Sequence, residues 1–220
     1  MRWLKSFAQK YPHWRLFLYW PVFGLLFLLA ERGNLSATYY QMHCALDDKI
    51  PFCELFLLPY LFWFVYLIGM HIYLFFTDGE EFTSFMRFII LTYSAGLIMF
   101  YLFPTCQTLR PAVFERDNIL TQIMAGFYQF DTNTNVCPSL HVVGSLAVTF
   151  AGLHNPRLKS FLWKFFFISQ GFLISISTIF VKQHSLLDVA AGLLVSLSAW
   201  ILVYGKETLQ ERQHALHPNT

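Results

Sequence analysis

The sequence predicts an all-α, polytopic membrane protein with six transmembrane helices. Of its 220 residues, 56% are hydrophobic and only 13% are charged, whereas soluble domains carry about 25% charged residues. Six apolar stretches approach the roughly 20 residues that an α-helix needs to cross a bilayer. Tryptophan and tyrosine recur near several ends of these stretches, as they do at membrane interfaces.

The expected spans are separated by the segments in which charged residues gather. They are Trp14–Ala30, Phe52–Phe76, Ser84–Phe103, Ser139–His154, Phe161–Phe180 and Ser185–Tyr204. No internal repeat divides the chain, so residues 1–220 are expected to form a single domain. The first apolar stretch is long and lacks a small-residue cleavage site, which argues against a cleavable signal peptide.

The basic residues predict that both termini face the cytoplasm. With this orientation, ten of the 15 Lys and Arg residues fall in cytoplasmic segments, as the positive-inside rule requires. Residues 1–13 then form a basic amphipathic start on the cytoplasmic surface, and residues 206–220 form a flexible cytoplasmic tail. The net charge is only +2 and the basic residues are dispersed, which argues against nucleic acid as a partner.

The third loop, residues 104–137, is long for so small a membrane protein, and long loops are often functional. Asp117 or Asn118 can cap a short amphipathic helix through Ile119–Tyr128. That helix is expected to lie on the membrane surface beside the site.

The first outer loop, Glu31–Pro51, is either a lid over the outer face or a plain connector. All four cysteines also fall on the outer side of this arrangement. Disulfides are therefore chemically allowed, and free thiols are an equal alternative. The candidate pairs are Cys44 with Cys53 and Cys106 with Cys137.

His184 and Asp188 lie where a polar loop enters the sixth span. Residues at i and i+4 share one face of a helix, so the carboxylate can hold one ring nitrogen and leave the other free. An aspartate inside an apolar segment costs roughly 2.5–3.5 kcal/mol on insertion scales, so Asp188 needs a partner. Beyond it, Gly192 is small enough to let a neighbouring helix approach closely.

His141 is expected at the same depth, one turn into the fourth span. Proline is favoured at the first position of a helix, so Pro138 predicts that the span begins there. The backbone N–H groups of Ser139, Leu140 and His141 then form an anion cradle at the positive helix end. Further side chains are expected to converge on this place. They are Arg110 after the third span, and Ser175, Ser177, Thr178, Lys182 and Gln183 near the outer end of the fifth.

This set of residues predicts phosphoryl transfer. Converging cationic donors describe a phosphate site. An imidazole held by a carboxylate is an activated nucleophile, and a second histidine can protonate the leaving oxygen. The site lies at the lipid boundary of an apolar protein, which favours a lipid phosphate as the substrate. We expect no cofactor and no metal.

The order and spacing of these motifs resemble the signature of the type 2 phosphatidic acid phosphatase superfamily, a metal-independent, integral-membrane group with six helices. The resemblance spans residues 103–188. It implies that His184 is the nucleophile, Asp188 orients it and His141 is the general acid. Arg110 and the start of the fourth span are implied to hold the phosphate. The matching positions are Arg110-Pro111, Pro138-Ser139-Leu140-His141, and Ser177-Thr178 followed by His184 and Asp188.

Three residues depart from the family pattern. Phe103 stands in place of a lysine, Leu140 in place of a glycine, and Thr178 in place of an arginine. Lys182 is the nearby basic residue that could partly compensate. This reduced pattern is similar to the branch that includes inositol phosphorylceramide synthases, in which an alcohol receives the head group.

The leading hypothesis is a phosphatase that hydrolyses a phospholipid or polyprenyl (pyro)phosphate monoester at the outer leaflet of the cell membrane. The first alternative is a lipid phosphotransferase that moves a phosphate-containing head group to an alcohol. A second alternative is a zinc site built from both histidines and Asp188, which nearby Arg110 and Lys182 would oppose. The third is a non-catalytic transporter or scaffold. The sequence predicts no oligomeric state.

Overall fold

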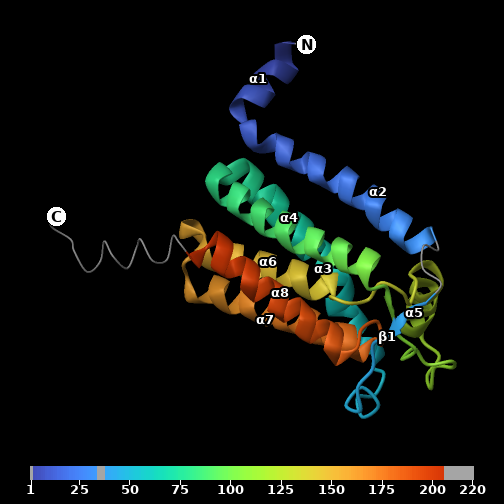
Figure 1. The fold of residues 1–220 in the computed structure, drawn as a ribbon. Helices are drawn as coiled ribbons and strands as arrows, with labels where there is room; N and C mark the ends of the chain where they lie inside the picture. The colour runs from blue at the N-terminus through green and yellow to red at the C-terminus, as the bar shows by residue number, and fades with distance from the viewer. Residues whose placement is uncertain (1, 34–37, 206–220) are drawn as a thin grey trace.

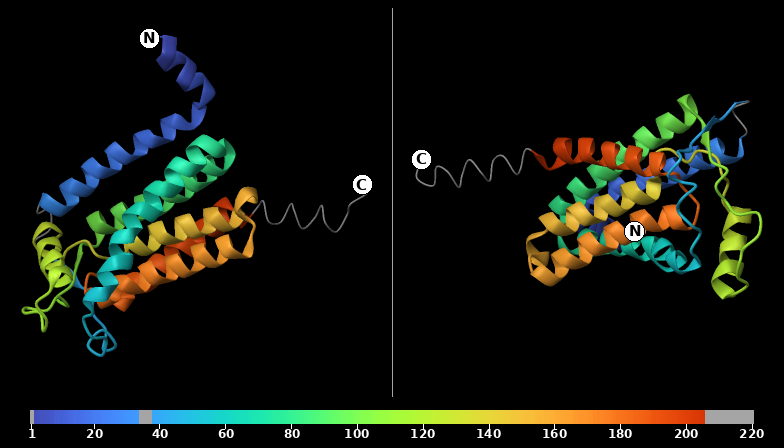
Figure 2. Two further views of the ribbon diagram at one scale, coloured as in Figure 1. Left: turned by 180° about the vertical axis from the view of Figure 1, so that it is seen from behind. Right: turned by 90° about the horizontal axis from the view of Figure 1, so that it is seen from below.

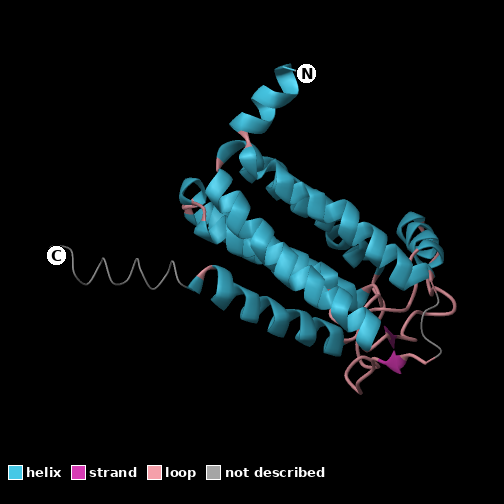
Figure 3. Cartoon of the chain, turned by 45° about the horizontal axis from the view of Figure 1, so that its top comes forward, coloured by secondary structure: helices cyan, strands magenta, loops and turns pink. Residues whose placement is uncertain are grey.

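The chain is helical almost throughout, which confirms the all-α class (Figure 1). The computed structural model describes residues 2–33 and 38–205. Two short strands, β1 (Tyr40–Gln41) and β2 (Thr105–Cys106), pair in parallel at one end of the molecule (Figure 3). The expected tail at 206–220 lies outside the described residues.

The helices match most of the expected spans. Within residues 2–33 and 38–205, five segments are long and apolar enough to cross a membrane: Pro12–Arg32, Glu54–Thr77, Gly79–Leu102, Phe161–Phe180 and Leu186–Val203. The first two begin with 3-10 turns, Pro12–Leu18 and Glu54–Phe56. The α-helices are α1 (Arg2–Lys10), α2 (Tyr19–Arg32), α3 (Leu57–Thr77), α4 (Gly79–Leu102), α5 (Ile119–Phe130), α6 (Leu140–His154), α7 (Phe161–Phe180) and α8 (Leu186–Val203).

The fourth expected span is shorter than the others. α6 has 15 residues, which corresponds to about 22 Å at 1.5 Å per residue. It packs against α3, α4, α7 and α8, so its neighbours enclose it and it needs less length facing lipid. A sixth transmembrane crossing, and the orientation of the termini, stay predictions.

Polar side chains set the helix starts. Ser139 accepts a hydrogen bond from the Val142 N–H and is the N-cap of α6. The predicted start at Pro138 is therefore wrong by two residues, because a serine hydroxyl satisfies the first-turn donor that proline cannot. Ser160 caps α7 and Ser185 caps α8 in the same way.

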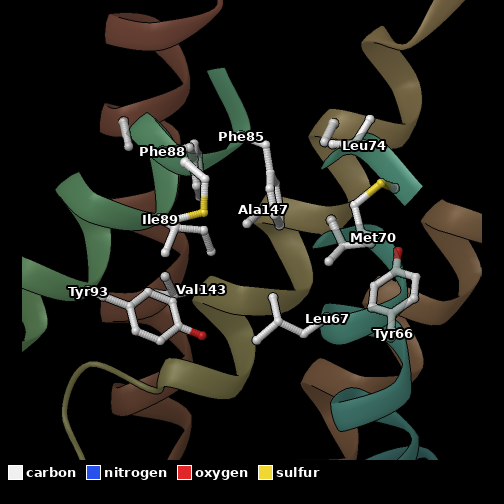
Figure 4. Close-up of a cluster of buried hydrophobic side chains, with 14 of the residues drawn as sticks. Tyr66, Leu67, Met70, Leu74, Phe85, Phe88, Ile89, Tyr93, Val143 and Ala147 are labelled. Atoms are coloured by element: carbon white, nitrogen blue, oxygen red, sulfur yellow. The ribbon is translucent and has the colours of Figure 1, made fainter. Parts of the chain in front are cut away.

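The core lies between α3, α4 and α6. Large side chains of α3 and α4 interlock with small residues of α6, as Figure 4 shows for Phe85, Ile89, Val143 and Ala147, which are all fully buried. Lipid tails are as apolar as these side chains, so close packing holds the helices together more than exclusion of water does.

α2 lies at the edge of the bundle, alongside α4 (Figure 2). Of its residues, only Phe23 and Ala30 are buried. The Tyr101 hydroxyl donates to the Leu26 carbonyl at 2.8 Å and the Tyr19 hydroxyl pairs with Ser94 at 3.1 Å. Further hydrogen bonds tie both ends of the helix to the bundle: Trp20 Nε1 donates to His71 Nε2 at 3.1 Å, and the Arg32 guanidinium donates to the Phe130 carbonyl at 2.6 Å.

The third loop contains the expected short helix, α5. Asn118 forms a capping box with Thr121, and Met124 packs in a small cluster with Leu57, Tyr60 and Val181. Its position at a membrane surface stays a prediction. The loop that carries β1 lies near α5, at the same end of the bundle (Figure 1).

All four cysteines are free thiols in the structure, and Cys137 is buried. The sequence left disulfides and free thiols as alternatives. The structure has free thiols, and neither the Cys44–Cys53 nor the Cys106–Cys137 disulfide is formed.

Candidate active site

His184 and Asp188 meet at the start of α8. Their Nδ1 and Oδ2 atoms lie 3.3 Å apart, and Asp188 is completely buried. The same Oδ2 accepts the Ser185 N–H at 2.9 Å, which completes the capping box of the helix. The carboxylate therefore holds the δ nitrogen of the ring and leaves the ε nitrogen outside this pair.

The start of α6 is fastened directly to this point. The Ser139 N–H donates to the Asp188 carbonyl at 3.1 Å. A Cβ atom at position 192 would lie 3.2 Å from the Ser139 carbonyl oxygen. α8 can approach the start of α6 this closely because residue 192 is glycine. The expected anion cradle loses one donor here, since the Ser139 N–H already has a protein partner.

His141 faces the same space as His184, with its ring centroid 6.0 Å away. Tyr60 stacks on the His141 ring at 4.3 Å and Trp63 lies at 4.4 Å. The His141 Nε2 atom is buried and has no hydrogen-bond partner among residues 2–33 and 38–205. The stacked rings orient the imidazole while that nitrogen stays available to a ligand.

Both histidines line a cavity of about 270 Å³. Its wall is mainly aromatic, and two carboxyl groups, Glu31 and Asp131, also face it. The described residues that line it include no lysine or arginine. The other lining residues include Trp20, Phe23, Phe27, Tyr60, Trp63, Tyr93, Asn135, Leu140 and Gln183.

Arg110 lies behind this wall. Its guanidinium donates to the carbonyls of Tyr128, Asp131 and Thr132 at 2.7–3.1 Å and to the Gln183 amide oxygen at 2.6 Å. Burial lowers the pKa of Arg110, an effect that nearby Asp131 opposes. Arg110 thus clamps the end of α5 to the loop before α8, and it reaches the cavity only through its partners.

Lys182 and Ser177 are not brought to the histidines. The Lys182 ammonium donates to the carbonyls of Asp47 and Ile50, at 2.8 and 2.5 Å, and faces a separate polar cavity that His43 also lines. The Ser177 hydroxyl donates to the Ile174 carbonyl within α7. Each side chain donates its hydrogen bonds to backbone carbonyls elsewhere, and neither lines the cavity around His184.

Asp47 is a residue whose importance the sequence did not show. It is buried, and its carboxylate accepts hydrogen bonds from Ser185 Oγ at 2.6 Å, Leu186 N at 2.9 Å and Cys44 N at 2.8 Å. Burial acts to raise the pKa of Asp47, but these hydrogen bonds outweigh it and lower the pKa. The first outer loop is thereby bound to the first turn of α8, directly after His184.

The zinc alternative finds no ligand set in the described part of the chain. Within residues 2–33 and 38–205, no three His, Cys, Asp or Glu side chains are grouped as metal ligands. His141, His184 and Asp188 do not form such a group.

Comparison with known proteins identifies a family for this chain. The model of a family described as the PAP2 superfamily matches residues 84–210, which is more than half of the chain. The matched segment runs from α4 beyond the end of α8 and includes His141, His184 and Asp188. No curated protein and no solved structure matches the chain.

Proposed function

Because this chain belongs to the PAP2 superfamily, whose members are phosphatases or related phosphotransferases, we propose that it is a membrane lipid phosphate phosphatase. In this proposal it hydrolyses a phospholipid or polyprenyl (pyro)phosphate monoester at the outer leaflet of the cell membrane. The observation that carries the proposal is the His184–Asp188 pair, with the His141 ring 6.0 Å from that of His184 across one cavity.

In the first step the Nε2 atom of His184 attacks phosphorus. A P–N bond forms, the bond between phosphorus and the lipid oxygen breaks, and His141 donates a proton to that oxygen. Asp188 fixes the Nδ1–H tautomer and stabilises the positive charge that develops on the ring.

In the second step a water molecule attacks the phosphohistidine. His141, which has lost its proton, accepts one from the water as the new P–O bond forms. The P–N bond then breaks, inorganic phosphate leaves, and both rings return to their starting states.

The test measures phosphate release by purified protein from a panel of lipid phosphates. We expect His184→Ala to abolish release and to prevent acid-labile phosphate labelling of the protein. The matched control is His43→Ala, because His43 pairs with Asp48 outside the cavity. Near-normal turnover by His184→Ala would refute the nucleophile assignment.

A second candidate is transfer of a phosphate-containing head group to an alcohol. It is favoured by the positions of Arg110 and Lys182, whose charges are engaged by backbone carbonyls. A monoester dianion therefore finds little compensating charge in the cavity, whereas a phosphodiester carries one negative charge. Assays with added alcohols separate the two reactions, because a new lipid without free phosphate is formed only by the transferase.

A further inference from the structure

The wall of the cavity around His141 and His184 is rich in hydrogen-bond acceptors. Glu31, in the last turn of α2, and Asp131, directly after α5, both face it. Thr132 Oγ1 donates to Oε2 of Glu31. The other carboxylate oxygen, Oε1, is buried, and no described residue donates to it within hydrogen-bond geometry, although the Asn135 amide lies nearby.

Asn135 adds a third acceptor to this wall. It is only 6% exposed, and its amide nitrogen donates to the Ala30 carbonyl at 3.1 Å. That bond fixes the orientation of the amide, because the reversed group would place two acceptors together. The amide oxygen is left buried without a donor in the part of the chain that the structure describes.

The Asp131 carboxylate forms no salt bridge with any of the described residues. Its carboxylate accepts a hydrogen bond from the Gln183 amide at 3.3 Å. Burial raises the pKa of Asp131, although nearby Arg110 opposes this. A buried carboxylate in this position is stabilised by a cation that enters the cavity.

The chemical group that complements this wall is a primary ammonium. It carries a positive charge and three donors and has no acceptor of its own. Aromatic rings also attract cations, and Phe27, one helix turn before Glu31, lines the same cavity. A neutral hydroxyl would satisfy one acceptor but would leave the charges of both carboxylates uncompensated.

The position of Asp131 limits how far this ammonium lies from the phosphate. Its carboxylate accepts a hydrogen bond from Gln183, the residue directly before His184. Because the proposed phosphate lies at His184, an ammonium bound at Asp131 is only a few bonds from phosphorus.

We propose that this cavity selects lipid phosphates that carry a primary ammonium group within a few bonds of phosphorus, bound by Glu31, Asp131 and Asn135. The inference rests on the proposed function, since it places the phosphate at His184. The same unit occurs in the aminoethyl head group of a phosphodiester lipid and in a long-chain amino-alcohol phosphate.

The first test measures binding by calorimetry, so that it does not depend on turnover. The probes are 2-aminoethylphosphonate and propylphosphonate, which have similar shapes and differ in the amine. We expect the amine to bind about 10- to 100-fold more tightly to the wild-type protein, as a hydrogen bond to a charged group allows. Hydroxyethylphosphonate, a neutral donor, should bind like the propyl compound.

Variants then locate the ammonium site. Glu31→Gln and Asp131→Asn should each reduce the preference for the amine, and binding of propylphosphonate reports that each variant is folded. Asp117→Asn is the matched control, because Asp117 pairs with Gln122 on the exposed side of α5, and it should keep the full preference. Equal binding of the two phosphonates to wild type, or an unchanged preference in both variants, would overturn the inference.

The second test uses three lipids in membranes: phosphatidic acid, phosphatidylethanolamine and a long-chain amino-alcohol phosphate. Faster turnover of either amine lipid than of phosphatidic acid supports the inference, and the product identifies the source, a transferred head group or free phosphate. If phosphatidic acid is turned over best, the ammonium site is refuted and the proposed function stands. If the amine phosphonate binds but no lipid is turned over, the ammonium site is supported and the proposed function fails.

Discussion

Replacement of Asp47 tests whether the first outer loop positions His184, the proposed nucleophile. Two of its three hydrogen bonds go to the first turn of α8, from Ser185 Oγ at 2.6 Å and Leu186 N at 2.9 Å. Each hydrogen bond to a charged acceptor is worth about 1.5–3 kcal/mol. For Asp47→Ala we count the two bonds to α8 and take the lower value, about 1.5 kcal/mol, for each, because water can enter the vacated space. The expected loss of stabilising free energy is therefore about 3 kcal/mol.

The lost hydrogen bonds are made at Ser185 and Leu186, directly after His184. We therefore expect the substitution to lower both the stability of the fold and the rate of the proposed reaction. A change of 3 kcal/mol corresponds to a factor of about 150, which is the upper limit for the fall in turnover. The measurements are unfolding in detergent and phosphate release at saturating substrate. Asp47→Asn, which keeps one acceptor oxygen, should fall between the wild type and the alanine variant.

The neighbouring residue provides the control. Asp48 is 64% exposed at its side chain and pairs only with His43 among the described residues, so Asp48→Ala should resemble the wild type. The reasoning is refuted if the two alanine variants behave alike.

The effect of Asp47 should also depend on pH. Its pKa is lower in the folded protein than the ordinary value of 3.8, so its stabilising contribution is fully present above that ordinary value. The contribution disappears as the pH falls through the lowered pKa of the folded state. The difference in unfolding midpoint between wild type and Asp47→Ala should therefore be large at pH 7 and shrink below about pH 4.

Three further changes test other parts of the site. Asp188→Asn should keep the fold but lower turnover by about 10²- to 10⁴-fold, since it favours the wrong tautomer of His184; wild-type turnover would contradict this. In Gly144→Ala the new Cβ would lie 2.6 Å from Tyr93 Oη and 2.9 Å from Trp63 Nε1, so unfolding should be easier by about 1–3 kcal/mol. Gly126→Ala, which meets nothing within 4 Å, is its control. Burial, and to a smaller extent Asp188, raise the pKa of the Cys137 thiol to about 12. This thiol should therefore resist maleimide at pH 8 and react once the protein is unfolded. Mass spectrometry of labelled peptides measures the difference.

Features that depend on neighbouring residues could be predicted from the sequence. The spacing of His184 and Asp188 is a property of one helix turn, and their atoms meet as expected. Phe161–Phe180 begins and ends where its apolar run does. The proximity of His141 to His184 is also as expected, with 6.0 Å between the ring centroids, whereas their depth in a membrane stays a prediction.

The orientation of the cationic side chains could not be predicted in the same way. Arg110 and Lys182 lie at the expected end of the bundle, but backbone carbonyls turn them away from the histidines: those later in the third loop bind Arg110, and those of the first outer loop bind Lys182. Carbonyl groups are present at every residue and leave no pattern in the sequence. For the same reason Asp47, which is 138 residues from Ser185, carries no local signal of its contact with α8.

The exposed outer face of α2 has a kinetic consequence for the proposed reaction. Phe23 and Phe27 face the cavity, while Leu25, Leu28 and Leu29 are exposed on the outside of the same helix. In a bilayer those leucines face lipid, so in the proposed reaction a substrate that moves sideways within its leaflet reaches the cavity of His141 and His184 past this helix, with its tails still in the lipid. The rate then depends on the surface density of the substrate in the membrane and not on its bulk concentration. Diluting the substrate with inert lipid at constant bulk amount should slow the reaction, and lengthening its acyl chains should change the rate little.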